Sequence, residues 1–100
     1  MIKKSPGIKG TLEISQSNNG FLIAGDPKGL RSFAKLLTWI ADVNQDSLKN
    51  MPDGERCHVH LHANEPVKSF NSLTRFSKET EICRLDAKGT GAFPKKYKTA

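Results

Sequence analysis

The fold is decided by residues 26–43, DPKGLRSFAKLLTWIADV. Asp26 and Pro27 predict a helix start, because aspartate can accept the first free backbone N–H groups and proline loses no hydrogen bond at the first helical position. Apolar residues then recur at spacings of three and four, which predicts a core-facing stripe: Leu30, Phe33, Ala34, Leu37, Ile40 and Ala41. Three more residues widen the stripe to one side: Leu36, Trp39 and Val43. The helix should end near Val43.

Strand patterns lie on both sides of this helix. Upstream, residues 8–15 and 21–25 form two apolar strand patterns joined by turn residues, which predicts a β-hairpin. Downstream, residues 57–62 alternate strictly between apolar and polar side chains, and residues 81–85 form a last strand pattern. The order β-β-α-β-β predicts an α+β fold in which one helix packs on one face of a small, mainly antiparallel four-stranded sheet.

The length and composition of the chain predict one domain. Its 100 residues are 36% hydrophobic and 26% charged, which is ordinary for a globular protein. Residues 1–87 are expected to form the single α+β domain, and residues 88–100 a flexible basic tail. No apolar run approaches the roughly 18 residues that cross a bilayer, and the lysines near the start precede no signal-peptide core. The sequence therefore predicts a cytoplasmic protein with no membrane partner.

The net charge of +6 belongs to the two ends of the chain. Between residues 5 and 87, ten basic and ten acidic side chains cancel. The excess comes from six lysines: Lys3, Lys4, Lys88, Lys95, Lys96 and Lys98. A nucleic-acid-binding module would gather basic side chains on one folded face, because it neutralises several phosphates at once. Nucleic acid is therefore a disfavoured partner, although a small nucleic-acid-binding module stays open as an alternative.

Three histidines lie on one face of the predicted strand at residues 57–62. His58, His60 and His62 are about 7 Å apart from neighbour to neighbour, because alternate strand residues share a face. Imidazoles at this spacing can share a metal ion with a further ligand from elsewhere. A metal-binding protein or metal-dependent enzyme using these histidines is therefore an alternative, and exposed polar residues of a sheet are the other interpretation.

Apart from that alternative, the sequence predicts neither catalysis nor a cofactor. It contains no nucleophile motif and no complete phosphate-binding loop. The two cysteines, Cys57 and Cys83, lie in apolar strand patterns and are expected to be buried, reduced thiols, since cytosolic disulfides are rare. We therefore expect a protein that is not an enzyme.

Three segments of the chain, read together, carry a family pattern. They are GDPKGLR at residues 25–31, an amphipathic Leu- and Ala-rich stretch at residues 33–41, and His-Val-His-Leu at residues 58–61. A G-x-x-x-G-L helix start followed by an H-V-H-L strand resembles a family of small bacterial immunity proteins encoded beside polymorphic toxins. Residues 81–86, EICRLD, resemble the final strand of that pattern, so the resemblance covers about residues 20–86.

The resemblance implies that the protein binds and neutralises a cognate toxin stoichiometrically, without catalysis. The docking surface expected from it combines the three histidines with the loop at residues 44–54 and includes six residues: His58, His60, His62, Trp39, Asp46 and Asp53. Trp39 has two interpretations, either as cover for the edge of the sheet or as a contact residue. An open sheet edge also leaves a homodimer open, because unpaired strands can pair with a second copy.

Overall fold

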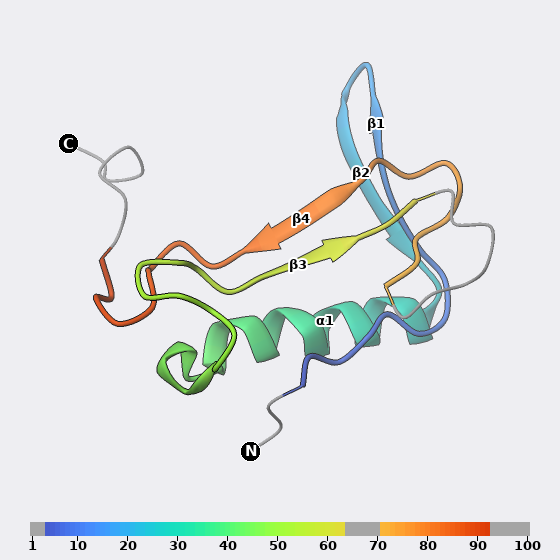
Figure 1. Cartoon of the computed structure of the whole chain (residues 1–100). Helices are drawn as coiled ribbons and strands as arrows, with labels where there is room; N and C mark the ends of the chain where they lie inside the picture. Colours follow the sequence, from blue (N-terminus) through green and yellow to red (C-terminus); the bar gives the residue numbers. More distant parts are fainter. Residues whose placement is uncertain (1–3, 64–70, 93–100) are drawn as a thin grey trace.

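One helix and four strands are the main elements of the described residues, which are 4–63 and 71–92 of the computed structural model (Figure 1). The elements follow in this order: β1 (Leu12–Ser17), β2 (Gly20–Gly25), α1 (Pro27–Asp42), a short 3-10 helix η1 (Gln45–Ser47), β3 (His58–Leu61) and β4 (Thr80–Cys83). This order confirms the predicted β-β-α-β-β succession and the α+β class. None of the described helices is long and apolar enough to cross a bilayer.

The strands form two separate antiparallel ladders. β1 pairs with β2 and β3 pairs with β4, so the prediction of one four-stranded sheet is wrong. Figure 1 shows the β1–β2 hairpin running steeply across one end of the β3–β4 ladder, with α1 below the ladder. The short strands of the second ladder are therefore flanked by irregular chain rather than by the hairpin.

The segment at residues 71–78 lies between the two ladders and keeps them apart. Leu73 donates its backbone N–H to the carbonyl of His62, just after β3, at 2.8 Å. Thr74 and Lys78 donate theirs to carbonyls of β1 at 3.0 and 2.8 Å. The outer edge of β1 is thereby occupied by an irregular segment, and this is the physical reason why no continuous sheet forms.

The helix buries a different side from the one predicted. The buried residues of α1 are Gly29, Ser32, Leu36 and Ile40, and Phe33 and Trp39 are partly buried against the core. Leu30 and Leu37 of the predicted stripe are 44% and 42% exposed. Most of the predicted stripe is therefore wrong, and the side that was expected only to widen it faces the core.

The side that α1 turns toward the core follows from a close approach between the start of the helix and the chain just before β1. A Cβ on Gly29 would lie 1.9 Å from the carbonyl oxygen of Thr11, and a Cβ on Gly25 would lie 2.6 Å from the same atom. Asp26 fixes the contact, because its Oδ1 accepts the N–H groups of Thr11 at 3.1 Å and Gly29 at 2.6 Å. The two glycines of the G-x-x-x-G-L start thus let the backbone pass at van der Waals distance, and Asp26 is the helix cap that the sequence predicts.

The core lies between α1 and the inner sides of the two ladders. Its cluster consists of Ile8, Leu12, Ile14, Leu36, Ile40, Val59, Leu61 and Leu73, with Ile82 packed against it. Cys57 is buried, and burial raises the pKa of its thiol. Cys83 is exposed, so the prediction of a second buried thiol is wrong. The reason is strand alternation: Ile82 turns toward the core, which directs Glu81 and Cys83 outward.

Candidate functional site

The outer face of the β3–β4 ladder carries a row of imidazoles. His58 and His60 are exposed on β3, whereas Val59 and Leu61 are buried, so the predicted alternation is present. The rings of His58 and His60 have centroids 5.0 Å apart and stand at 90°. The rings of His60 and His62 are 6.4 Å apart and nearly parallel. These three residues are called the histidine face below.

Side chains of β4 border the histidine face. The strand register places Glu81 opposite His60 and Cys83 opposite His58, and both residues are exposed. One ligand atom each from His58, His60 and Glu81 lies within 4.8 Å of the other two. These three side chains could hold a metal ion, and Glu81 joins the group in the position that His62 takes in the sequence-based alternative.

The other predicted site residues lie on α1, on η1 and in the turn that follows η1. Asp46 is exposed and accepts the backbone N–H of Gly89 at 2.8 Å. Asp53 is also exposed, and its Oδ1 would lie 3.6 Å from a Cβ on Gly89. Trp39 packs against the core cluster and borders a shallow groove on α1. The structure therefore groups Asp46 with Asp53 beside Gly89 and places Trp39 on the helix. It also brings part of the predicted loop to the histidines, because residues 48–51 and His58 line one hollow.

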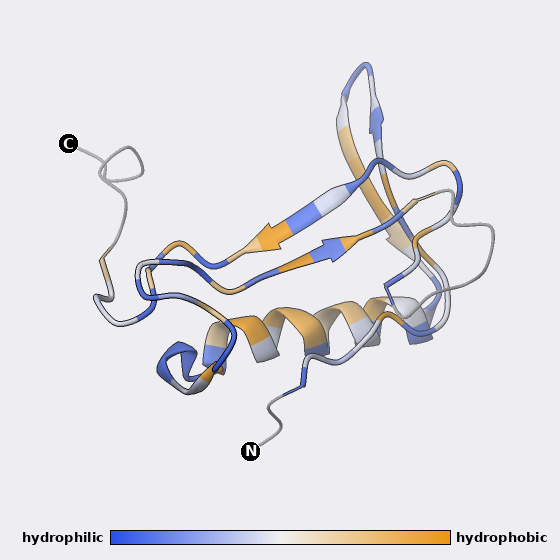
Figure 2. Cartoon of the chain, in the orientation of Figure 1, coloured by the Kyte–Doolittle hydropathy of each residue, from blue (hydrophilic) through white to orange (hydrophobic). Residues whose placement is uncertain are grey.

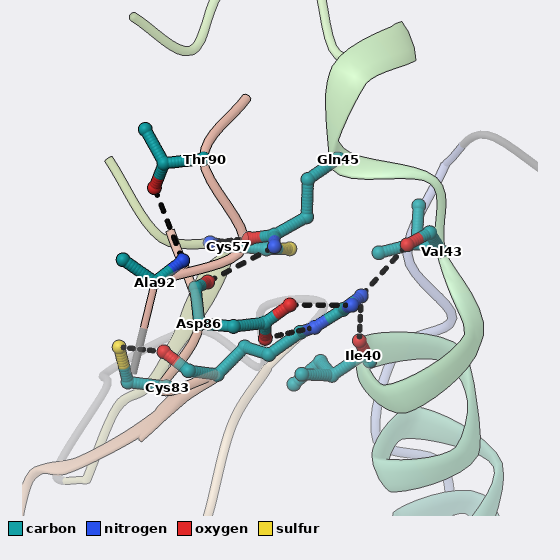
Figure 3. Close-up of polar contacts among 9 residues, drawn as sticks. Ile40, Val43, Gln45, Cys57, Cys83, Asp86, Thr90 and Ala92 are labelled. Carbon is teal, nitrogen blue, oxygen red and sulfur yellow. Dashed lines mark hydrogen bonds and ion pairs between the residues drawn. The ribbon is translucent and has the colours of Figure 1, made fainter. Parts of the chain in front are cut away.

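Arg84, which the sequence analysis did not single out, caps the end of α1; Figure 3 labels its partners Ile40, Val43 and Asp86. Arg84 Nη1 donates to the carbonyls of Val43 at 2.7 Å and Ile40 at 3.3 Å, where the helix dipole favours a positive charge. Its Nε and Nη2 donate to the two carboxylate oxygens of Asp86 at 2.7 and 3.0 Å. The hydrogen bond and charge of Arg84 hold the pKa of Asp86 below its usual value. This network joins β4 to the helix and is structural.

We expect the Arg84–Asp86 pair to make stability pH-dependent. Because the pKa of Asp86 is lowered in the folded protein, the pair stabilises the fold above the ordinary aspartate pKa of about 4 and loses this effect as the pH falls through the lowered value. Urea unfolding should therefore show that wild type has a higher free energy of unfolding than Asp86→Asn at pH 7. This difference should shrink below about pH 4. A difference that stays constant down to pH 2 would contradict this role.

Further contacts hold the segment after β4. The buried Gln45 accepts the backbone N–H of Cys57 at 2.8 Å and donates to the carbonyl of Asp86 at 3.0 Å. Lys88 Nζ donates to two carbonyls of the chain at residues 48–51. The ammonium group of this lysine is therefore engaged within the fold. Residues 93–100 of the predicted tail lie outside the described residues.

The strand β2 presents apolar side chains that the sequence analysis did not select. Phe21, Leu22 and Ile23 are 75%, 49% and 55% exposed, and Figure 2 shows the hydrophobic colour along this strand. Phe21 and Ile23 project to one face of the hairpin and Leu22 to the other, and the three residues together are called the β2 surface below. Successive strand residues point to opposite faces, so three consecutive apolar residues in a two-stranded hairpin cannot all be covered. The three consecutive apolar residues are visible in the sequence. Their exposure was not predicted, because a four-stranded sheet was expected to cover part of them.

Comparison with known proteins identifies the class. The matching family model describes an immunity protein, a class that implies toxin neutralisation and whose members are typically non-catalytic. The chain belongs to the family described as Immunity protein 32, with a match over residues 21–74, more than half of its length. This confirms the predicted resemblance to immunity proteins. No curated protein and no solved structure was found to match the chain.

The family match covers some elements of the fold and leaves others out. It contains β2 from Phe21 onward, α1 and β3, and therefore the G-x-x-x-G-L helix start and the H-V-H-L strand. It contains neither β1 nor β4, so the resemblance predicted for residues 81–86 lies outside it. The β2 surface and the histidines of β3 thus belong to the part of the chain that the family shares, whereas Glu81 and Cys83 do not.

Proposed function

We propose that this protein binds one cognate toxin molecule per chain and neutralises it by occupying its surface, with no reaction catalysed on the toxin. The observation that carries the proposal is the family match over residues 21–74. Stoichiometric binding needs an exposed surface with apolar anchors and hydrogen-bonding capacity. The described residues offer such groups on β2 and on the outer face of the β3–β4 ladder.

The β2 surface supplies the anchors. Phe21 is the most exposed large apolar side chain among the described residues, at 75%, and exposed aromatic residues are frequent hot spots of protein interfaces. β2 pairs with β1 on one edge, and no hydrogen bond found among the described residues uses its other edge. A toxin segment could therefore add to this edge as a further strand while its side chains pack on the apolar residues.

The histidine face extends this surface. Figure 1 shows the free end of the hairpin projecting past the β3–β4 ladder on the side away from α1, the side to which the outer face of the ladder also turns. Phe21 lies near that free end, next to Gly20, the first residue of β2 after the turn at residues 18–19. We assign the centre of the docking surface to β2 and its rim to His58, His60 and His62. Trp39, Asp46 and Asp53 are left out, because Trp39 packs against the core and the two aspartates lie beside Gly89.

Replacing His60 by glutamate should weaken toxin binding several-fold, since a rim charge of the wrong sign mainly slows association. His60 is exposed, so the fold should be retained. Surface plasmon resonance with immobilised toxin would measure the change. Thr38→Glu is the matched control, because it adds the same charge at an exposed position of α1, away from the proposed surface. Equal affinity of His60→Glu and wild type would remove the histidine face from the docking surface.

The function itself is tested by a toxicity-rescue assay. The protein is co-expressed with the product of the gene encoded directly upstream in its own genome, and growth is followed with and without it. The proposal predicts growth arrest by the toxin alone and recovery with this protein, together with a stable complex on a sizing column. A toxic product whose effect is unchanged by this protein would contradict the proposal for that pair.

A further inference from the structure

The β3–β4 ladder holds four metal-ligating side chains in a two-by-two array on its outer face. His58 stands opposite Cys83 and His60 opposite Glu81 in the strand register. Residues directly opposite in an antiparallel pair project to the same face, with Cβ atoms about 4.5–5.5 Å apart. Two histidines from β3 thus meet a carboxylate and a thiol from β4, and all four residues are exposed.

Three of these side chains are nearly placed for coordination. Ligand atoms of His58, His60 and Glu81 lie within 4.8 Å of one another. Around a tetrahedral Zn²⁺ with ligands at about 2.0–2.1 Å, neighbouring ligand atoms are about 3.4 Å apart. The side chains must therefore close by at most about 1.4 Å, a shift that exposed side chains make by rotation about their χ angles. The backbone need not move.

Cys83 can supply the fourth ligand. Its thiol is free, and Sγ donates a hydrogen bond to the carbonyl of its neighbour Arg84 at 3.1 Å. A thiol is a weak hydrogen-bond donor, so little is lost when the side chain turns toward His58, the residue opposite it. The thiol releases its proton on coordination and binds as a thiolate. The other cysteine, Cys57, is buried and precedes the ladder.

We propose that His58, His60, Glu81 and Cys83 form a binding site for a divalent transition metal ion such as Zn²⁺. Two imidazoles, one carboxylate and one thiolate are the ligand types that tetrahedral zinc takes in proteins. His62 is outside this set, because its Nδ1 lies 3.2 Å from Glu79 Oε2. The ion clamps β3 to β4. This site does not depend on toxin binding, and two of its ligands lie outside the range shared with the family.

The site is tested on the full chain purified without a histidine tag. Zn²⁺ is titrated by isothermal calorimetry, and Co²⁺ by absorption spectroscopy, since cobalt reports tetrahedral geometry and thiolate ligation. The expected result is one ion per chain, a thiolate-to-cobalt charge-transfer band, and a higher Tm with zinc because only the folded ladder binds it. Absence of saturable binding, or half an ion per chain, would overturn the site.

Variants identify the ligands. His60→Ala should weaken zinc binding about tenfold or more, and Cys83→Ser should abolish the charge-transfer band. His62→Ala is the matched control, because it removes a neighbouring imidazole of the same face without touching the set, and it should bind zinc like wild type. Equal losses in His60→Ala and His62→Ala, or a band that survives Cys83→Ser, would overturn the assignment. Since these measurements use the isolated protein, their failure leaves toxin neutralisation unaffected.

Discussion

Gly29→Ala should lower the free energy of unfolding by about 3 kcal/mol or more, the upper end of the cost of overpacking. The new Cβ would lie 1.9 Å from the carbonyl oxygen of Thr11. That oxygen belongs to backbone and cannot rotate away, and Asp26 binds Thr11 and Gly29 through one carboxylate oxygen. Relief therefore requires the chain before β1 to separate from α1. Urea denaturation followed by circular dichroism would show the midpoint falling sharply.

Lys35→Ala is the control for this change. Lys35 is exposed on the same helix, and alanine favours helix at least as well as lysine. Its unfolding free energy should stay within about 0.5 kcal/mol of wild type. If Gly29→Ala unfolds at the same urea concentration as Lys35→Ala, then the close approach of Thr11 to the helix start, and the rotation of α1 that follows from it, would be contradicted.

Phe21→Glu should weaken toxin binding by about 30-fold or more, the effect of losing an interface hot spot of 2 kcal/mol. The ring is 75% exposed in the free protein, so it contributes little to the fold. In the proposed complex it is buried, and a carboxylate in its place would remain desolvated without a partner. Affinity for the purified toxin is the measurement, and the urea midpoint should stay at the wild-type value.

The same substitution at another exposed phenylalanine provides the control. Phe76 is 68% exposed and lies after the range shared with the family. The guanidinium of Arg75 lies over its ring, with 5.0 Å from Cζ to the centroid. Phe76→Glu should bind toxin like wild type. Equal affinities for Phe21→Glu and wild type would move the docking surface away from β2, and equal losses at both positions would indicate a general charge effect.

Local chemistry explains why the order of the elements and the start of α1 were predictable, although the first strand, predicted at residues 8–15, lies at Leu12–Ser17. Asp26 and Pro27 determine where α1 begins through hydrogen bonds within one turn. The alternation in β3 separates His58 and His60 from the buried Val59 by backbone geometry alone. These features need no knowledge of distant parts of the chain.

The errors arose where distant segments decide the outcome. The apolar stripe of α1 was assigned from apolar residues at spacings of three and four. The close approach of Thr11 to Gly29 instead turns inward the side that carries Gly29, Leu36 and Ile40, and it leaves Leu30 and Leu37 exposed. The single sheet was excluded by Thr74 and Lys78 bonding to β1. Both contacts join residues far apart in sequence, so spacing and periodicity carry no trace of them.

The candidate sites also combine features that local sequence determines with features that distant segments determine. The row of histidines could be predicted, because it depends only on strand alternation. Its pairing with Glu81 and Cys83 could not, because it depends on the β3–β4 register across a connection of 18 residues, 62–79. The exposure of the β2 surface was not predicted, because a four-stranded sheet would have covered part of Phe21, Leu22 and Ile23.

Neutralisation by stoichiometric binding is tested most directly by titrating the activity of the purified cognate toxin with this protein. We predict that activity falls linearly, reaches its minimum at one equivalent, and does not fall further with time of incubation. Native mass spectrometry of the endpoint should then show a one-to-one complex of two unmodified chains. Full inactivation by a small fraction of one equivalent, growing with time, would show a catalytic mechanism and contradict binding as the basis of immunity, as would activity unchanged at excess protein.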